Sequence, residues 1–279
     1  MPIHDQSYRR YGGGKTMPGQ AWTVIARAGI MNMIRKRIFL AVLLGGWIPF
    51  VGHAIWLYVN ARYPQVSIVT VTPKTFRDFF SWQDFFVFVV TVYVGAGLIA
   101  NDRRANALQI YLSKPLARSE YIFGKAAVLL AFLLSITLVP ALLLLVLQVL
   151  FSGSFEFIRH NLFLIPAIVT ASLLQSLLAT FTMLALSSLS KSARFVAIMY
   201  AGTIFFTLAI FGVLAAITGG TRLSWVALGA NLQQVTDVIF REPPRYTTPW
   251  QLSLVVILGL IAVSISVLER RVRGVEVVT

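Results

Sequence analysis

The order of apolar and polar segments along the chain predicts six membrane-spanning helices. Long apolar runs alternate with short polar segments, and each run is close to the roughly 20 residues that a helix needs to cross the hydrocarbon core of a bilayer. The expected spans cover residues 38–58, 83–100, 122–151, 162–186, 195–217 and 250–268. The predicted fold class is therefore all-α, a polytopic membrane protein with six transmembrane helices.

Two of these spans are expected to depart from a straight helix. Gly45, Gly46 and Pro49 predict a bend in the first span. At about 1.5 Å per residue, residues 122–151 would reach roughly 45 Å, which exceeds the ~30 Å thickness of the hydrocarbon core. The third span must therefore tilt, kink at Pro140 or protrude.

Small and hydroxylated residues mark one face of the fourth span. Ser172, Ser176 and Thr180 recur at intervals of four residues, and Gln175 lies at the flank of this stripe. Such a stripe most often forms a seam between two helices, because small side chains let helix backbones approach closely. The alternative is that these three residues form a translocation face.

Two further amphipathic segments are predicted outside the spans. Residues 21–37 form a helix whose apolar stripe contains Trp22, Ile25, Gly29 and Met33. This stripe and the basic residues that follow it indicate an N-terminal elbow helix in the membrane interface.

The second amphipathic segment lies between the fifth and sixth spans. Its apolar positions at helical spacing are Trp225, Leu228, Leu232, Val235 and Ile239, and its polar positions Asn231, Gln234 and Asp237 lie opposite. The pattern predicts an external helix that lies on the surface or is partly inserted.

Composition supports the assignment to the membrane. Of the 279 residues 57% are hydrophobic and 12% are charged, with a mean hydropathy of +0.78; a soluble domain has about 25% charged residues. The absence of cysteine excludes disulfides, thiolate metal sites and catalytic thiols. Residues 1–20 are expected to be a flexible basic tail, and residues 21–279 a single transmembrane domain.

The distribution of basic residues predicts the orientation. Of the 24 Lys and Arg residues, 17 fall on the side that carries both termini and 7 on the opposite side. The side richer in Lys and Arg is the cytoplasmic side of a membrane protein. Both termini are therefore expected in the cytoplasm, and the net charge of +14 does not call for nucleic acid as a partner.

The segment between the second and third spans, Asn101–Lys125, is the most informative part of the chain. Asn101 is expected to cap a short helix that begins at Asp102 and ends at Lys114–Pro115. Ser119 is expected to cap the next helix, which leads into the third span. On these grounds the segment is either an ordinary positively charged connector or a docking site for a soluble partner.

The pattern N-D-x-R-x-x-A-L-x-x-x-L-S-K-P-L-x-R-x-E-Y-x-x-G-K in this segment resembles the cytoplasmic loop of ABC-2-type transporter permeases. The similarity is to small bacterial permeases whose ATPase is a separate chain, and in that family the loop helps to contact the ATPase. The candidate coupling residues that it implies are Asp102, Arg103, Arg104, Leu108, Leu112, Lys114, Arg118 and Glu120.

The chain shows no catalytic machinery of its own. The ten acidic residues are expected in tails, loops or span boundaries, so no buried carboxylate is predicted. The histidines His4, His53 and His160 are too scattered to suggest a metal or haem site, and His53 is expected to be a packing group. Gly12–Thr16 reads GGGKT, a near match to a phosphate-binding loop that lacks the first glycine and the preceding strand.

The resemblance therefore implies a permease subunit of an ATP-driven exporter in the bacterial cytoplasmic membrane. Its partners would be a cytoplasmic ABC ATPase, which binds the ATP and Mg²⁺, and a second copy of the chain or a homologous permease. The alternatives are a membrane scaffold or assembly subunit without transport activity and, with least support, an intramembrane enzyme. An apolar interior poor in acidic residues is compatible with lipids, lipid-linked glycans, hydrophobic drugs or peptides as substrates.

Overall fold

The computed structural model describes residues 20–63, 71–107 and 117–272. Within these residues six helical segments are long and apolar enough to cross a membrane, which confirms the all-α, six-span prediction. They are Arg37–Arg62, Pro73–Arg104, Arg118–Ser152, Leu164–Leu189, Ala193–Thr218 and Trp250–Arg271. The proposed basic tail, residues 1–20, lies almost entirely outside the described residues, as does the near-match loop Gly12–Thr16.

Several of the spans are built from more than one helix. In chain order the elements are α1 (Ala21–Ile34), α2 (Arg37–Gly45), α3 (Ile48–Arg62), α4 (Pro73–Val90), the π-helical turn η1 (Thr91–Gly95), α5 (Ala96–Arg104), α7 (Arg118–Ile136), α8 (Leu138–Ser152), α9 (Glu156–His160), α10 (Leu164–Leu189), α11 (Ala193–Thr218), the 3-10 turn η2 (Ser224–Val226), α12 (Leu228–Ile239) and α13 (Trp250–Arg271).

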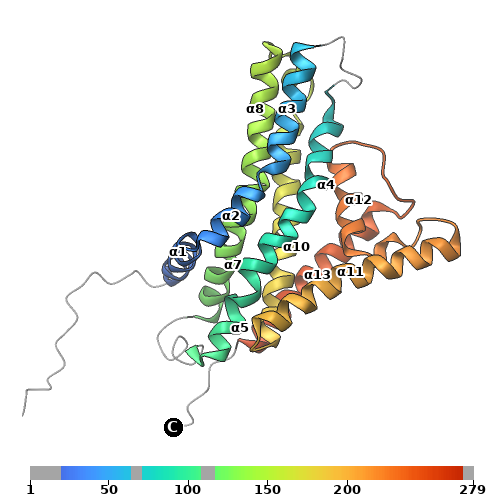
Figure 1. The fold of residues 1–279 in the computed structure, drawn as a ribbon. Coiled ribbons are helices and arrows are strands. Elements are labelled where there is room, and N and C mark those ends of the chain that lie inside the picture. The colour runs from blue at the N-terminus through green and yellow to red at the C-terminus, as the bar shows by residue number, and fades with distance from the viewer. Residues whose placement is uncertain (1–19, 64–70, 108–116, 273–279) are drawn as a thin grey trace, which may run out of the picture.

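The helix α10 forms the centre of the bundle, because it packs against α13, α5, α7 and α11. The helices α3 and α8 run side by side at one end, whereas α11 slants away from the bundle axis (Figure 1). Most apolar side chains of α11 face outward, as expected for a helix that contacts lipid. The predicted elbow helix is present as α1 and packs on α7.

The second span begins ten residues earlier than the sequence pattern predicted. The helix α4 starts at Pro73 instead of Gln83, and a capping box between Thr72 and Thr75 together with proline in the first turn fixes this start. Phe76 and Phe79 at the beginning of α4 are buried in a cluster with residues of α3, α8 and α10, so packing supports the outward extension of the helix.

The two predicted irregularities occur close to where they were expected. The first span bends between α2 and α3, and the side-chain amide of Gln83 donates to the backbone carbonyl of Gly46 at the bend (3.0 Å). The third span is interrupted at Thr137, just before Pro140, because proline cannot donate the next helical hydrogen bond. The Thr137 hydroxyl donates to the carbonyl of Leu133 (2.9 Å), which also accepts from the Thr137 amide (3.0 Å).

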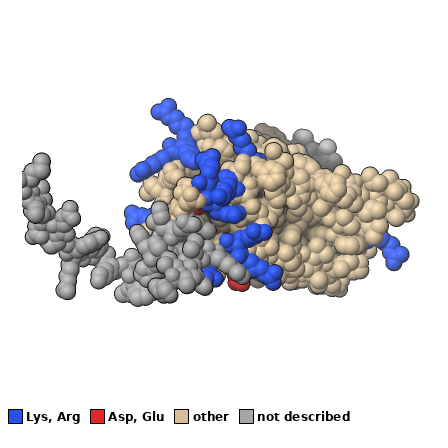
Figure 2. All heavy atoms as spheres, turned by 90° about the horizontal axis from the view of Figure 1, so that it is seen from below, with Lys and Arg blue, Asp and Glu red and all other residues tan. Residues whose placement is uncertain are grey.

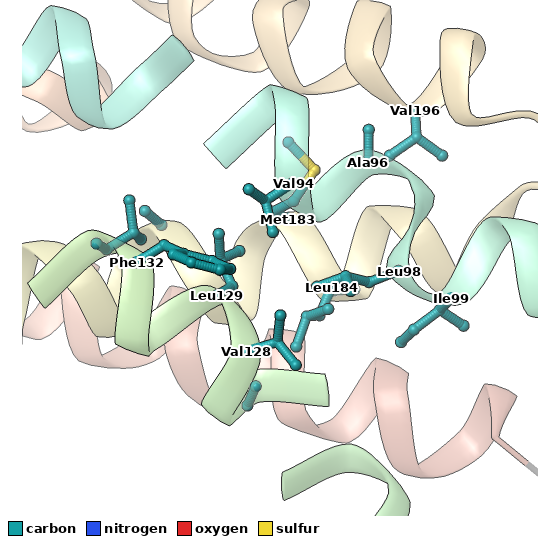
Figure 3. Packing of buried hydrophobic residues seen from close by; sticks show 14 of the residues in the cluster. Val94, Ala96, Leu98, Ile99, Val128, Leu129, Phe132, Met183, Leu184 and Val196 are labelled. Atoms are coloured by element: carbon teal, nitrogen blue, oxygen red, sulfur yellow. The ribbon is translucent and has the colours of Figure 1, made fainter. Parts of the chain in front are cut away.

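The main core lies where α5, α7 and α10 meet. Side chains from these helices and from α11 interdigitate, with Met183 close to Val94 and Val196 beside Ala96 (Figure 3). Gly95 permits this approach: a Cβ atom at position 95 would lie 2.4 Å from the Met183 Cγ atom and 2.9 Å from the Leu129 Cδ2 atom. The π-helical turn that ends at Gly95 therefore sits at a close contact of the second span with α7 and α10.

The predicted external helix is present as α12, but its polar face is not exposed. Asn231, Gln234 and Asp237 have exposed fractions of 1%, 1% and 0%, respectively. The Gln234 side chain donates to the carbonyls of Tyr246 (2.9 Å) and Thr248 (2.7 Å) and accepts from the Tyr246 amide. The polar stripe of α12 thus fastens the segment that leads into α13, instead of facing solvent.

Candidate coupling surface

One end of the bundle carries most of the exposed basic side chains. Viewed from below, Lys and Arg side chains gather around this end, with few acidic ones (Figure 2). The exposed basic residues at the helix ends and turns that meet here are Arg104, Arg118, Lys191, Arg194, Arg270 and Arg271. This surface is called the basic end below. It contains the two flanks of the loop between α5 and α7, residues 105–117, which is the predicted docking site and is called the docking loop below.

Asp102 joins the two flanks of that loop. Its carboxylate accepts a hydrogen bond from the Tyr121 hydroxyl (2.7 Å) and forms a salt bridge with the Lys125 ammonium group (2.7 Å). The Lys125 ammonium also lies 5.5 Å from the centre of the Tyr121 ring. The end of α5 and the first turns of α7 are therefore held together by charged and hydrogen-bonded contacts, on which the sequence pattern gave no information.

Arg103 and Ser187 connect α5 to the central helix. The Arg103 guanidinium donates a hydrogen bond to the backbone carbonyl of Ser188, near the C-terminus of α10. The buried Ser187 hydroxyl accepts from the amides of Ile99 (3.2 Å) and Ala100 (3.0 Å) and donates to the carbonyl of Ala96 (2.9 Å). A displacement of α5 at the basic end must therefore move the end of α10 or break these bonds.

Glu120 connects α7 to the N-terminal helix. One carboxylate oxygen accepts from the Ala117 amide (3.0 Å) and the other from the Ala21 amide at the start of α1 (3.3 Å). The contact continues through two glycines, because a Cβ atom at Gly124 would lie 2.8 Å from the Ile25 Cβ atom and one at Gly29 only 2.5 Å from Val128. The elbow helix is thus locked to the helix that follows the docking loop.

The remaining candidate coupling residues divide into two groups. Arg104 and Arg118 are exposed at the basic end, and Arg118 borders a hollow of about 380 Å³ whose other lining residues include Phe123 and Glu269. Leu108, Leu112 and Lys114 lie outside the described residues, so their predicted role stays a prediction.

Two predicted helix caps next to the loop were wrong. Asn101 does not begin a new helix, because the second span continues through it to Arg104. The next helix begins at Arg118 with Ala117 at its N-cap position, and Ser119 lies inside its first turn. In that turn the Glu120 side chain supplies the cap to the Ala117 amide that a Ser119 hydroxyl was expected to provide.

The candidate translocation residues Ser172, Ser176 and Thr180 are all buried on α10, each with an exposed fraction of 0%. Their hydroxyl groups have no hydrogen-bond partner among the described residues. A place in a translocation route stays a prediction for these three residues.

The prediction that no carboxylate lies inside the bundle was wrong. Asp84 lies within α4, and its carboxylate accepts from the side-chain amides of Gln175 (2.7 Å) and Gln233 (3.5 Å). The sequence pattern placed Asp84 at the edge of the second span, and the extension of α4 to Pro73 moves it into the helix interior. The signal that could have revealed it is the stripe that Phe76, Phe80 and Asp84 form at helical spacing.

A second buried network ties α12 to α4 at the end of the bundle remote from the basic end. The Asp237 carboxylate accepts from the Arg77 guanidinium (3.3 Å), the Arg245 guanidinium (3.1 Å) and the Arg245 amide (3.0 Å). Burial raises the pKa of the Asp237 carboxyl above its ordinary value, while the Arg245 and Arg77 charges act in the opposite direction. The network needs residues 160 positions apart, which is why no local pattern predicted it.

These features define a polytopic membrane protein with six spans, an elbow helix and a basic end built around the loop between spans two and three. Residues 78–271 match the family model described as ABC-2 family transporter protein, and the chain belongs to this family as a permease membrane domain. A search of curated protein sequences found no match. The family match confirms the resemblance that was inferred from Asn101–Lys125.

Proposed function

We propose that this chain is the membrane-spanning permease subunit of an ATP-driven exporter, and that it couples ATP hydrolysis on a separate cytoplasmic chain to movement of its spans. The observation that carries the proposal is the anchoring of both flanks of the docking loop. Asp102 and Arg103 fasten its beginning to α7 and α10, and Glu120 fastens its end to α1. A force applied to the loop is therefore transmitted to three other helices.

The chemistry of the basic end indicates what kind of partner it accepts. Exposed Arg104 and Arg118 suit acidic side chains at the rim of a partner's cleft, where charge mainly accelerates association and selects the partner. Leu108 and Leu112 are proposed as apolar anchors in that cleft, because buried apolar anchors supply most of the affinity at an interface. ATP and Mg²⁺ would be bound by this partner.

The proposal includes a second permease, either another copy of this chain or a homologous one, in the bacterial cytoplasmic membrane. The broad outward-facing apolar surface of α11 is compatible with both lipid and a second permease. The basic end is proposed to face the cytoplasm, since it carries the excess of Lys and Arg that marks that side of a membrane protein.

The decisive experiment compares two substitutions that act on the coupling contacts in different ways. Leu108→Asp should prevent an ATPase from remaining bound during purification, whereas Arg104→Ala should weaken binding modestly and mainly at low ionic strength, where an exposed charge is least screened. ATPase retention and hydrolysis rate are measured in nanodiscs, and monodisperse elution shows that each permease variant is folded. Full retention and normal turnover by Leu108→Asp would contradict the docking role.

The alternative function, a scaffold without transport activity, predicts a different outcome for a substitution in the contacts that hold the two flanks of the docking loop. Asp102→Asn removes the salt bridge to Lys125 and leaves the exposed docking residues unchanged. A coupled exporter should keep its ATPase and lose substrate-stimulated hydrolysis, whereas a scaffold would have no such stimulation to lose. The matched control is Glu269→Gln, which changes an exposed carboxylate at the same end of the bundle.

A further inference from the structure

The structure contains a groove between α3 and α4 that the coupling function does not use. Its volume is about 680 Å³, within the range typical of small-molecule sites. The lining residues on the α3 side are Ile48, Pro49, Gly52, His53 and Trp56, and those on the α4 side are Thr72, Lys74, Thr75, Asp78, Trp82 and Phe86.

The polarity of the groove changes along its length. Because α3 runs outward and α4 returns inward, Ile48 and Phe86 line the end deeper in the bundle, and Thr72 and Lys74 line the outer end. Between them the His53 ring packs edge-on against Phe79, with 5.6 Å between ring centres, and its Nδ1 atom lies 2.8 Å from the Pro49 carbonyl oxygen. His53 is therefore a packing group, as the sequence predicted, and forms part of the groove wall.

Lys74 gives the outer end a positive charge that nothing described neutralises. The other charged residue there, Asp78, receives two hydrogen bonds from the Arg77 guanidinium (2.7 and 2.9 Å), so its charge is already paired. Lys74 is exposed and forms no salt bridge within the described part of the chain. Residues 64–70, which precede it, contain no acidic residue. A free ammonium group at the mouth of an apolar groove is complementary to an anionic head group attached to an apolar chain.

We propose that this groove binds one membrane lipid with an anionic phosphate head group. The acyl chain lies along Ile48, Trp56 and Phe86, and the phosphate accepts hydrogen bonds from the Lys74 ammonium group. Lysine binds phosphate as a compact point charge, so charge and not head-group shape selects the lipid. This inference does not depend on an ATPase, because it concerns a site within one permease chain.

Gly52 provides a way to fill the groove without disturbing the fold. A Cβ atom at this position would meet no atom within 4 Å, so a larger side chain projects into the open groove. The matched control is Gly212 on α11, which is equally open and lies away from the groove. To test the charge, Lys74→Gln is compared with Arg222→Gln, which removes an exposed cation from the loop between α11 and η2.

The test titrates the detergent-purified full chain with phosphatidylglycerol or phosphatidylcholine and counts bound lipids by native mass spectrometry. Gly52→Leu should weaken the tightest-bound lipid at least tenfold, because the added side chain occupies its space, and Gly212→Leu should not. Lys74→Gln should weaken phosphatidylglycerol about fivefold and leave phosphatidylcholine unchanged, while Arg222→Gln changes neither. Thermal unfolding midpoints show that the variants are folded.

Two results would overturn the proposal. Equal lipid retention by Gly52→Leu and Gly212→Leu would show that bound lipid is ordinary annular lipid. A Gly52→Leu variant that keeps its lipid but loses a dimeric state would assign the groove to a second copy of the chain. Loss of ATPase coupling with normal lipid binding would bear only on the proposed function.

Discussion

Gly29 on α1 lies so close to Val128 on α7 that a Cβ atom at position 29 would fall 2.5 Å from the Val128 Cγ2 atom. The sequence identified Gly29 as part of the interfacial stripe of the elbow helix, and the structure shows that this stripe faces α7. The elbow helix is thus packed into the helical bundle, in addition to its predicted place at the membrane surface.

The first prediction concerns this contact. Gly29→Leu should separate α1 from α7 and lower the unfolding free energy by about 1–3 kcal/mol, the usual cost of inserting side-chain atoms into a packed contact. The measurement is the thermal midpoint of the purified permease. Ala28→Leu, at the exposed neighbouring position, is the control and should leave the midpoint unchanged; an equal effect of both would refute the tight contact.

The second prediction concerns the π-helical turn in the second span. Gly95→Ala should be destabilising, because the new methyl group overlaps Met183. Gly202→Ala should be neutral or stabilising, because Gly202 lies on α11 and an added methyl group there meets open space. Adding Met183→Ala to Gly95→Ala should recover part of the loss. Thermal midpoints of the wild type, Gly95→Ala, Met183→Ala and the double variant test this coupling, and strict additivity of the two changes would contradict it.

The third prediction concerns the buried charge network. Asp237→Ala removes the buried acceptor shared by the Arg77 guanidinium, the Arg245 guanidinium and the Arg245 amide, while Asp78 still pairs with Arg77, and it should destabilise the protein by about 1–3 kcal/mol. Glu156→Ala removes an exposed carboxylate with no described ion pair and serves as the control. Denaturant unfolding in mixed micelles compares the two. A loss no larger than that of Glu156→Ala would contradict a stabilising role for this network.

The fourth prediction concerns orientation. Because the chain has no cysteine, single cysteines report accessibility without background. Cysteine in place of Thr247 should react with a membrane-impermeant maleimide in intact cells, and cysteine in place of Ala105 should react only after permeabilisation. Both positions are exposed in the structure, so reversed labelling would mean that the basic end faces outward.

The sequence by itself determined the six spans, the elbow helix and the external helix. These elements follow from the length and period of the apolar runs, which indicate whether each segment prefers water, the lipid core or the interface between them. It also determined the family, since the pattern in Asn101–Lys125 is local in the chain. The bends near Gly46 and Pro140 were predictable for the same reason, because backbone geometry at glycine and proline is a property of the residue.

Only the tertiary structure decided which polar groups are buried and what they contact. Asp84 accepts a hydrogen bond from Gln175, and Asp237 and Asp102 form salt bridges with Arg77 and Lys125, respectively. Each contact joins two different helices that pack together only in the folded bundle. Packing also supports the extension of the second span to Pro73, where the local capping box sets the helix start, since burial of Phe76 and Phe79 outweighs the polar residues between them. Hydropathy measures each residue's preference for water or lipid, and it contains no information on a polar partner supplied by another helix.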